Sequence, residues 1–273
     1  MNILVTGVTA GFGKAIAELL IAKGHTVIGT GRRQAKLDEL KQQHGDKFIP
    51  LAFDIADLQA TKAALKTLSN DLLTNIDVLV NNAGLALGLA TADQADMNDW
   101  QQMINTNTLG LVNITHAILP SMVANNSGYI INISSIAGNY PYLGGNVYGA
   151  TKAFVTQFSL NLRADLVGKN IRVTNIEPGL CGGTEFSNVR FHGDDAKAAQ
   201  VYENVQAITP QDIANMVAWL IEQPKHVNVN RIEVMPTAQT FAGLKVVKDF
   251  SAHDRNTKLN LANAYQIKNE AID

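Results

Sequence analysis

Residues 1–13 have the sequence MNILVTGVTAGFG, which predicts a strand, a glycine-rich turn and the start of a helix. The apolar, β-branched run Ile3–Thr6 has the length of a buried strand. Gly7, Gly11 and Gly13 suit a loop whose backbone turns tightly and approaches a ligand without interference from Cβ atoms. The following helix would direct free N–H groups at a phosphate. The spacing GxxxGxG differs from the usual GxGxxG, so an ordinary tight βα turn is the alternative.

Further along the chain, short apolar runs alternate with helix-length segments. The expected strands are Ile3–Thr6, Thr26–Thr30, Phe48–Phe53, Val78–Asn81, Tyr129–Ser134 and Arg172–Ile176, with a seventh candidate at Asn228–Met235. The expected helices are Lys14–Lys23, Leu58–Leu72, Trp100–Val123, Asn146–Val167 and Asp212–Glu222. This alternation predicts an α/β fold, a single-domain Rossmann-type doubly wound parallel sheet of about seven strands flanked by helices.

Composition limits the classes of function. The chain has 273 residues, and its 22 lysine and arginine residues nearly balance 24 aspartate and glutamate residues. This balance excludes a protein dominated by a basic surface for nucleic acid or an anionic membrane. The single Cys181 cannot form an intrachain disulfide. The sequence shows neither a secretory signal nor an apolar run of membrane-spanning length, so we expect a cytoplasmic protein with a small-molecule substrate.

The domain is expected to span residues 1–245, because no linker rich in proline or serine interrupts the alternation of strands and helices. Over residues 246–273 the charges balance and the hydrophobic periodicity is weak. We expect this tail to be poorly ordered. The alternative is that it packs on the domain or on a neighbouring subunit.

The residues after the second expected strand bear on the choice of cofactor. A site for NAD would place a carboxylate there to bind the ribose 2′-hydroxyl, but this chain has Arg32 and Arg33. Guanidinium groups bind a 2′-phosphate through charge-assisted hydrogen bonds, so we expect NADP(H). A solvated basic turn is the alternative. Asp54, followed by Ile55, lies where an adenine amino group could bind, although capping the next helix is an equally simple role.

Tyr148 and Lys152 form the candidate proton-transfer pair. They stand four residues apart in an expected helix, so both side chains project from one face. We expect the ammonium group to lower the pKa of the phenol and make it usable near neutral pH. Ser135 lies at the carboxyl end of an expected strand, where open α/β sheets bind ligands. Its neighbour Ser134 is the less favoured alternative.

These motifs together resemble the short-chain dehydrogenase/reductase family. The matching residues are Thr6-Gly7, Gly11, Gly13, Asn81-Asn82-Ala83-Gly84, Asn107, Ser135, Tyr148, Lys152 and Pro178-Gly179. The resemblance implies that Tyr148 is the general acid/base and that Ser135 binds the reacting oxygen. It also implies that Lys152 holds the nicotinamide ribose and that Asn107 supports a water-linked proton relay. The implied cofactor-binding set is Gly7, Thr9, Gly11, Phe12, Gly13, Arg32, Arg33, Asp54, Ile55, Asn81, Ala83, Gly84, Tyr148, Lys152, Pro178, Gly179, Thr184, Glu185 and Phe186.

Asn81 has a second possible role in that set, since stabilising the central sheet is as good an interpretation as contact with the cofactor. Pro178-Gly179 and residues 184–186 are expected to pass over the nicotinamide end.

Residues 81–88, 144–154 and 177–191 resemble the NADP-dependent 3-hydroxy acid dehydrogenases. This resemblance implies oxidation of L-serine, L-allo-threonine, 3-hydroxyisobutyrate or 3-hydroxypropionate, and the reverse reduction of 3-oxo acids. Cys181 departs from the aliphatic residue expected there, without altering the chemistry. A 3-hydroxy acid carries a carboxylate, so the site should offer a cation. Arg190, in a substrate loop expected at about residues 180–208, is the candidate, and a surface or interface salt bridge is its alternative role.

Other functions fit part of the pattern. The chain could reduce an uncharged ketone or aldehyde, because family membership fixes the reaction better than the substrate. It could also be a non-catalytic NADPH-binding regulator, although its catalytic set is intact. No metal is expected, since the six histidines lack metal-ligand spacing and no cysteine pair accompanies them. The resemblance also implies a homotetramer with Trp100–Val123 and Asn146–Val167 at the interfaces.

Overall fold

The computed structural model describes residues 1–241, so the expected tail at 246–273 lies outside the described residues. The strands are β1 (Asn2–Thr6), β2 (Thr26–Gly31), β3 (Phe48–Ala52), β4 (Val78–Asn81), β5 (Gly128–Ile133), β6 (Ile171–Pro178) and β7 (Arg231–Val234). They form one parallel sheet in the order β3-β2-β1-β4-β5-β6-β7. The predicted α/β fold is therefore confirmed. The strand order reverses between β1 and β4, which is where open sheets of this kind bind ligands.

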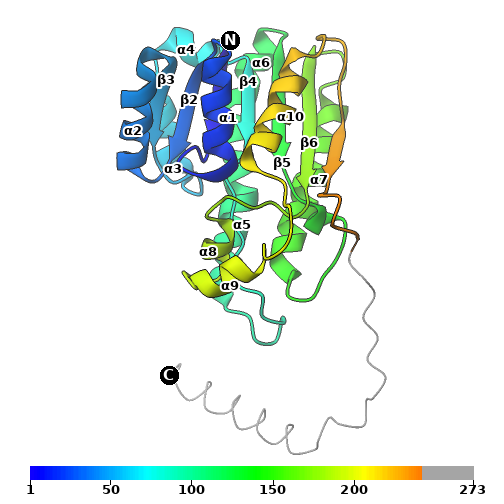
Figure 1. Cartoon of the computed structure of the whole chain (residues 1–273). Helices are drawn as coiled ribbons and strands as arrows, with labels where there is room; N and C mark the ends of the chain where they lie inside the picture. The colour runs from blue at the N-terminus through cyan, green and yellow to red at the C-terminus, as the bar shows by residue number, and fades with distance from the viewer. Residues whose placement is uncertain (242–273) are drawn as a thin grey trace, which may run out of the picture. The chain divides into compact units, whose positions relative to one another are not determined.

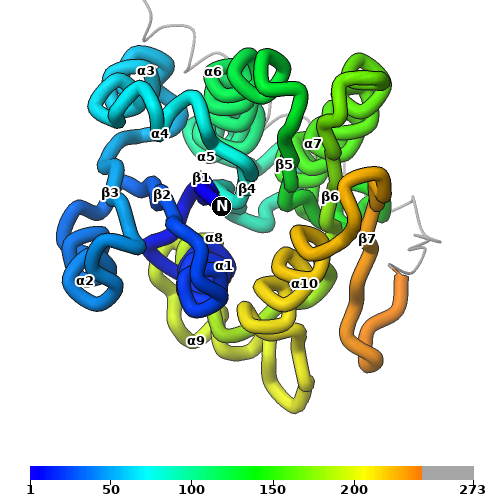
Figure 2. Tube along the Cα trace, turned by 90° about the horizontal axis from the view of Figure 1, so that it is seen from above, coloured from blue at the N-terminus to red at the C-terminus, as the bar shows by residue number. Residues whose placement is uncertain are grey.

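Helices cover both faces of the sheet (Figure 1, Figure 2). One face carries α1 (Gly11–Ala22), α2 (Gln34–His44) and α10 (Pro210–Glu222). The other carries α3 (Leu58–Leu65), α4 (Asn70–Thr74), α6 (Leu111–Ala124) and α7 (Asn146–Asp165). Each face buries its own apolar cluster, as expected for parallel strands that are hydrophobic on both sides. Within residues 1–241, no helix is long and apolar enough to cross a membrane.

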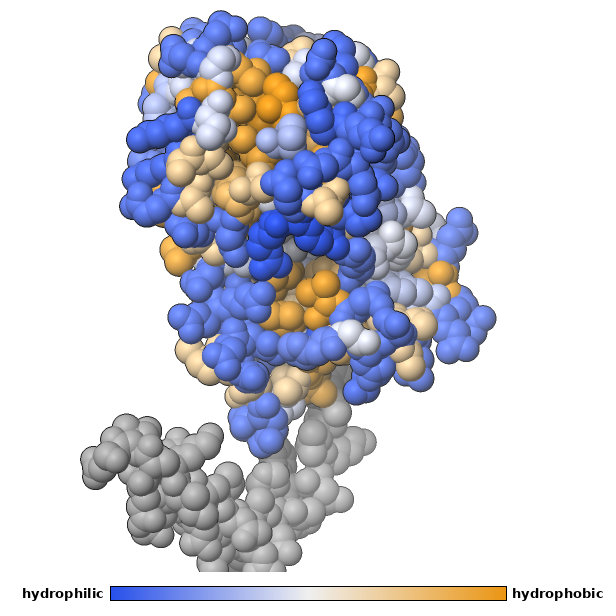
Figure 3. All heavy atoms as spheres, turned by 90° about the vertical axis from the view of Figure 1, so that its left-hand side faces the viewer, coloured by the Kyte–Doolittle hydropathy of each residue, from blue (hydrophilic) through white to orange (hydrophobic). Residues whose placement is uncertain are grey.

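Three further helices lie at the carboxyl ends of the strands. Figure 1 shows α5 (Met97–Ile104), α8 (Phe186–Arg190) and α9 (Asp195–Gln200) at this end. Short helical turns complete the fold, namely η1 (Gly45–Lys47), η2 (Asn105–Gly110) and η3 (Ile136–Gly138). Seen from the side of β3, a band of strongly hydrophilic side chains crosses the surface above apolar ones (Figure 3).

Two helix predictions need correction, and one helix was not predicted. Trp100–Val123 is not one helix, because the π-helical stretch η2 separates α5 from α6. Leu58–Leu72 is also divided, since α3 ends at Leu65 and the Ser69 side chain caps α4. Helix α2 was not predicted, because Leu37 and Leu40 are its only buried residues and the hydrophobic periodicity is weak.

The predicted glycine-rich turn has the backbone that glycine permits. Gly7 has φ +74° and Gly11 has φ +52°, both in the left-handed region. Gly13 needs glycine for a different reason, since a Cβ atom there would lie 2.1 Å from the Gly7 carbonyl oxygen. Helix α1 follows Ala10, which offers no side-chain cap, so its first N–H groups are left for another acceptor.

Replacing Gly13 by Ala should therefore lower the free energy of unfolding by more than about 2 kcal/mol, because the loop must move to relieve the overlap. Gly24→Ala is the matched control, since Gly24 has φ +88° but open space around it. Backbone strain alone should cost about 1 kcal/mol there. Urea unfolding of both variants checks this. A smaller loss for Gly13→Ala than for Gly24→Ala would contradict the close-approach explanation.

Candidate active site

Tyr148 and Lys152 lie one turn apart on α7, and each is only 7% exposed. The Lys152 Nζ atom lies 5.8 Å from the centre of the Tyr148 ring and donates a hydrogen bond to the Ile133 carbonyl at 3.0 Å. The last residue of β5 thus holds the ammonium group beside the phenol. The predicted pair is brought together as the i, i+4 spacing requires.

The two serines after β5 have different surroundings. The Ser135 hydroxyl donates to the Pro178 carbonyl at 3.3 Å and accepts from the Ala137 N–H at 3.1 Å. It also contributes a hydrogen bond that lowers the pKa of Tyr148. The Ser134 hydroxyl instead donates to the Lys152 carbonyl at 2.7 Å, inside the protein. Ser135 is therefore the serine beside the phenol.

The expectation that Tyr148 has a lowered pKa is wrong in direction. Burial raises the pKa of the phenol and has the largest effect, and the nearby Tyr142 adds to it. The Ser135 hydrogen bond and the Arg190 charge act in the opposite sense but do not outweigh burial. Burial also lowers the pKa of Lys152 to about 8. The phenol is thus a proton donor at neutral pH.

Asn107 lies in η2 and is 2% exposed. Its amide donates to the Leu85 carbonyl at 2.8 Å and to the Thr151 hydroxyl at 3.0 Å, and its oxygen accepts from the Leu85 N–H at 2.9 Å. Both amide hydrogens are used in joining the chain after β4 to α7. A Cβ atom on Gly84 would lie 3.2 Å from the Asn107 Oδ1 atom and 3.5 Å from the Lys152 Nζ atom. Glycine therefore leaves room beside both groups.

The glycine-rich loop is tied to the end of β4 by Thr6 and Asn82, two motif residues for which the sequence suggested no role. The Thr6 hydroxyl accepts from the N–H groups of Asn82 and Ala83, at 3.0 and 2.9 Å. The Asn82 amide donates to the Thr6 carbonyl at 2.8 Å and to the Gly7 carbonyl at 3.2 Å. Asn81 points elsewhere, donating to Thr115 and Asn132 inside the protein. This geometry supports the sheet-stabilising role of Asn81.

The arginines predicted to bind a 2′-phosphate lie beside the glycine-rich loop. Arg33 donates to the Thr9 hydroxyl at 3.0 Å and pairs with Glu185 at 2.9 Å. Arg32 lies 3.7 Å from Asp54, and both are about half exposed. Asp54 also accepts from the Ala56 N–H at 2.9 Å, but the N-cap of α3 is Asp57, so the capping alternative for Asp54 is wrong. Ile55 is buried, and Phe12 packs on the core beneath the loop.

Residues 184–186 span the distance between this loop and Tyr148. A Cβ atom on Gly11 would lie 3.3 Å from the Thr184 side chain, and Glu185 pairs with Arg33. The Phe186 ring lies 5.9 Å from the Tyr148 ring, centre to centre. The chain leads to residues 184–186 from Gly179, which is anchored at the sheet because its N–H donates to the Val234 carbonyl at 2.7 Å. It therefore passes over the region between the phosphate loop and the phenol.

Arg190, at the end of α8, reaches the same phenol. Its Cζ atom lies 5.6 Å from the centre of the Tyr148 ring. Its Nε atom donates to the Gly88 carbonyl at 3.2 Å, and its Nη2 atom donates to the Tyr142 hydroxyl at 2.7 Å. No carboxylate pairs with it among residues 1–241, so within this part of the chain Arg190 forms no salt bridge.

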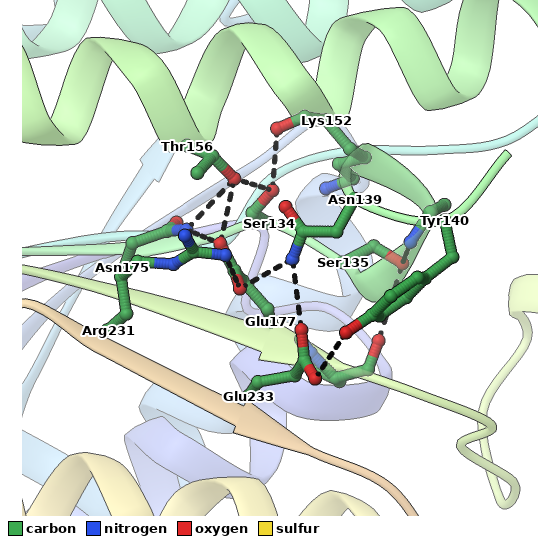
Figure 4. A network of polar contacts seen from close by, with 12 residues as sticks. Ser134, Ser135, Asn139, Tyr140, Lys152, Thr156, Asn175, Glu177, Arg231 and Glu233 are labelled. Atoms are coloured by element: carbon green, nitrogen blue, oxygen red, sulfur yellow. Dashed lines mark hydrogen bonds and ion pairs between the residues drawn. The ribbon is translucent and has the colours of Figure 1, made fainter. Parts of the chain in front are cut away.

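Behind the site, Glu177 forms a buried polar network (Figure 4). Its side chain is 0% exposed. One carboxylate oxygen accepts from Thr156 at 2.9 Å and Asn175 at 2.6 Å. The other accepts from Asn139 at 2.9 Å and Arg231 at 2.7 Å. The network links β6 to α7, β7 and the residue that follows η3.

Tyr142 was missed from the sequence, while Thr6, Asn82 and Glu177 were named only as parts of matching stretches, without a role of their own. Only Glu177 left a signal, since a charged residue directly after an apolar strand run and before Pro178 indicates a buried carboxylate. The contacts of the others join residues far apart in the chain, as in the 76-residue separation of Thr6 and Asn82. Among the described residues, no three histidine, cysteine, aspartate or glutamate side chains gather as a metal site.

Replacing Lys152 by Met should stabilise the protein near pH 7, by on the order of 3 kcal/mol at most. The pKa of this lysine falls from 10.5 to about 8 on folding, so below pH 8 the folded protein must bury a charge. That cost disappears as the pH rises from about 8 towards 10.5. In this range Lys152 is already neutral in the folded protein but still protonated in the unfolded chain. The difference in the free energy of unfolding between Lys152→Met and the wild-type protein should therefore shrink as the pH rises.

Urea unfolding at about pH 7 and about pH 9.5 measures this difference, and Lys169→Met, at an exposed position, serves as the control. A stability difference that stays constant or grows with pH would contradict the buried charge.

Comparison with known proteins identifies the family. The short chain dehydrogenase family profile matches residues 1–195. A probable NADP-dependent dehydrogenase of Haemophilus influenzae is 68% identical over 246 residues, covering 90% of this chain and 97% of that protein. The NADP-dependent 3-hydroxy acid dehydrogenase YdfG of Escherichia coli K12 is 56% identical over 246 residues, covering 90% and 99%. The solved closed form of serine dehydrogenase complexed with NADP+ has a TM-score of 0.89 at 55% identity, covering 91% of this chain and 100% of that one. The chain belongs to the short-chain dehydrogenase family.

Proposed function

We propose that this protein is an NADP-dependent dehydrogenase that interconverts a 3-hydroxy acid and its 3-oxo acid. The observation that carries the proposal is the position of Arg190, whose guanidinium lies 5.6 Å from the ring of Tyr148 without a carboxylate partner among the described residues. A fixed cation beside a proton-transfer group suits a substrate with a carboxylate near the reacting carbon. Relatives named for 3-hydroxy acids and for serine support this substrate class.

The residues present fit a dinucleotide. A side chain on Gly13 would fill the loop, and the uncapped start of α1 leaves N–H groups for a phosphate. Arg32 and Arg33, at the end of β2, would hold a 2′-phosphate, and Thr184 would cover the diphosphate. When bound, NADP+ supplies the acceptor for the hydride that leaves the carbinol carbon.

The protein's own groups would handle the proton and the charge. In oxidation, Tyr148 accepts the hydroxyl proton while Ser135 donates a hydrogen bond to the same oxygen. The charges of Lys152 and Arg190 stabilise the phenolate that forms. In reduction, the neutral phenol, favoured by its burial, gives its proton to the developing alkoxide. Arg190 would hold the substrate carboxylate in both directions.

We also retain the homotetramer and the cytoplasmic location as predictions. Exposed apolar side chains lie on the two helical regions expected at interfaces, with Ile104 40% exposed, Leu109 50% exposed and Phe154 40% exposed. Phe154 stacks on Phe158 with ring centres 5.7 Å apart. Burying such side chains against another subunit would stabilise an oligomer.

A panel of substrates tests the proposed function. The purified protein should oxidise L-serine, L-allo-threonine and 3-hydroxyisobutyrate with NADP+, at a kcat/KM at least about tenfold above that with NAD+. A plain secondary alcohol should be a poorer substrate. Tyr148→Phe should abolish turnover and keep NADPH binding, because it removes only the proton-transfer group. Preference for the uncharged alcohol would favour a general carbonyl reductase, and unchanged turnover in Tyr148→Phe would remove the assigned mechanism.

The carboxylate role of Arg190 has its own test. Arg190→Ala should raise KM for 3-hydroxy acids by about 10- to 100-fold, because a charge-assisted hydrogen-bonding group is lost. KM for the uncharged alcohol should change less than about threefold. Lys197→Ala is the control, since it removes a cation from α9 that pairs only with Asp194 among the described residues. An equal rise for acid and alcohol would show that Arg190 does not bind the carboxylate.

A further inference from the structure

Arg190 is held in place by groups outside its own helix. Helix α8 has only five residues, which is too short to orient a long side chain by itself. The Gly88 carbonyl accepts from the Arg190 Nε atom, and the Gly88 N–H donates to the Arg190 carbonyl at 2.8 Å. The Tyr142 hydroxyl accepts from the Nη2 atom at 2.7 Å, the shorter of the two side-chain hydrogen bonds. Tyr142 thus contacts the end of the guanidinium fork.

The Tyr142 ring has a fixed position. A Cβ atom on Gly145 would lie 2.8 Å from the Tyr142 Cε1 atom, so the ring occupies space that only glycine leaves free. The Gly145 N–H donates to the Tyr142 carbonyl at 3.0 Å, which closes the turn before α7. The ring also packs against the apolar cluster that contains Leu85, Met103 and Tyr148. The hydroxyl is therefore presented from a rigid support.

The guanidinium lies close to two tyrosine rings. Its Cζ atom is 5.5 Å from the centre of the Tyr142 ring and 5.6 Å from that of Tyr148. Within residues 1–241, Nε and Nη2 each make one hydrogen bond, so the Nη1 hydrogens and the second Nη2 hydrogen remain for a ligand. Two adjacent donors of this kind bind a carboxylate in a bidentate manner.

We propose that Tyr142 is the positioning residue that fixes Arg190 for recognition of the substrate carboxylate, and so sets the preference for 3-hydroxy acids. This assignment rests on the proposed function. The Tyr142 hydroxyl fixes the Nη2 atom, and the remaining Nη hydrogens would bind the substrate carboxylate while the carbinol carbon lies at Tyr148. Without that hydrogen bond, Gly88 alone would hold the side chain, and the fork could rotate.

Tyr142→Phe tests the assignment, because it removes the hydroxyl and keeps the ring. The value of kcat/KM for 3-hydroxyisobutyrate should fall about tenfold more than that for the uncharged alcohol, because any change at the phenol affects both substrates alike and only the acid also loses a positioned guanidinium. Tyr140→Phe is the matched control. Its hydroxyl, two residues away in the same turn, donates to Glu233 at 3.0 Å and makes no contact with Arg190.

The double variant Tyr142→Phe/Arg190→Ala separates positioning from a structural role. If Tyr142 acts through Arg190, the double variant should have the same KM for the acid as Arg190→Ala. The assignment would be overturned if the increases in KM of the two single variants multiplied in the double variant. It would also be overturned if Tyr142→Phe reduced kcat/KM equally for the acid and the alcohol. Either result would leave the role of Arg190 intact. If Arg190→Ala shows no selective loss for acids, or the wild-type protein does not oxidise them, the proposed function fails and the assignment fails with it.

Discussion

The buried carboxylate of Glu177 is the interaction on which the geometry of the active site depends. It accepts hydrogen bonds from α7 through Thr156, from the residue after η3 through Asn139, and from β7 through Arg231. The carboxylate is fully buried and its partner Arg231 is 41% exposed; hydrogen bonds to a charged group contribute about 1.5–3 kcal/mol each, so these elements are held together. Helix α7 carries the phenol and the ammonium group, while the carbonyl of Pro178, next to Glu177, accepts from the serine hydroxyl. The phenol, the ammonium group and the serine hydroxyl come from separate elements, and this network holds them in fixed positions relative to one another.

A second constraint is the short segment between β6 and α9. It contacts the glycine-rich loop through Thr184, the end of β2 through Glu185 and the phenol through Phe186. It then ends at Arg190, which docks on the chain after β4. One segment therefore contacts both the expected cofactor site and the expected carboxylate site. This arrangement suits a reaction in which cofactor and substrate must be enclosed together, because excluding water strengthens each electrostatic contact.

Sequence patterns predicted the sheet well and the helices less well. All seven strands overlap the runs from which they were predicted, and the runs are most continuous in the central strands β1, β4 and β5, which are buried on both faces. The π-helical stretch at η2 escaped notice because a change of hydrogen-bond register hardly alters hydrophobic periodicity. The direction of the Tyr148 pKa shift was wrong for a similar reason. The spacing to Lys152 indicates a neighbouring charge, but the loss of water around the phenol depends on elements that arrive from elsewhere.

By itself, the sequence determined the α/β fold, the glycine-rich loop and the proton-transfer pair. Each of these depends on residues that are close in the chain, where periodicity and i, i+4 spacing dictate geometry. The sequence favoured Ser135 over Ser134 and offered Arg190 as a candidate, but only the tertiary structure shows that both lie beside the phenol. Arg190 and its hydrogen-bond partner Tyr142 are 48 residues apart, and no local pattern encodes their contact. Such contacts arise only when the sheet, its helices and the loops at the strand ends assemble together.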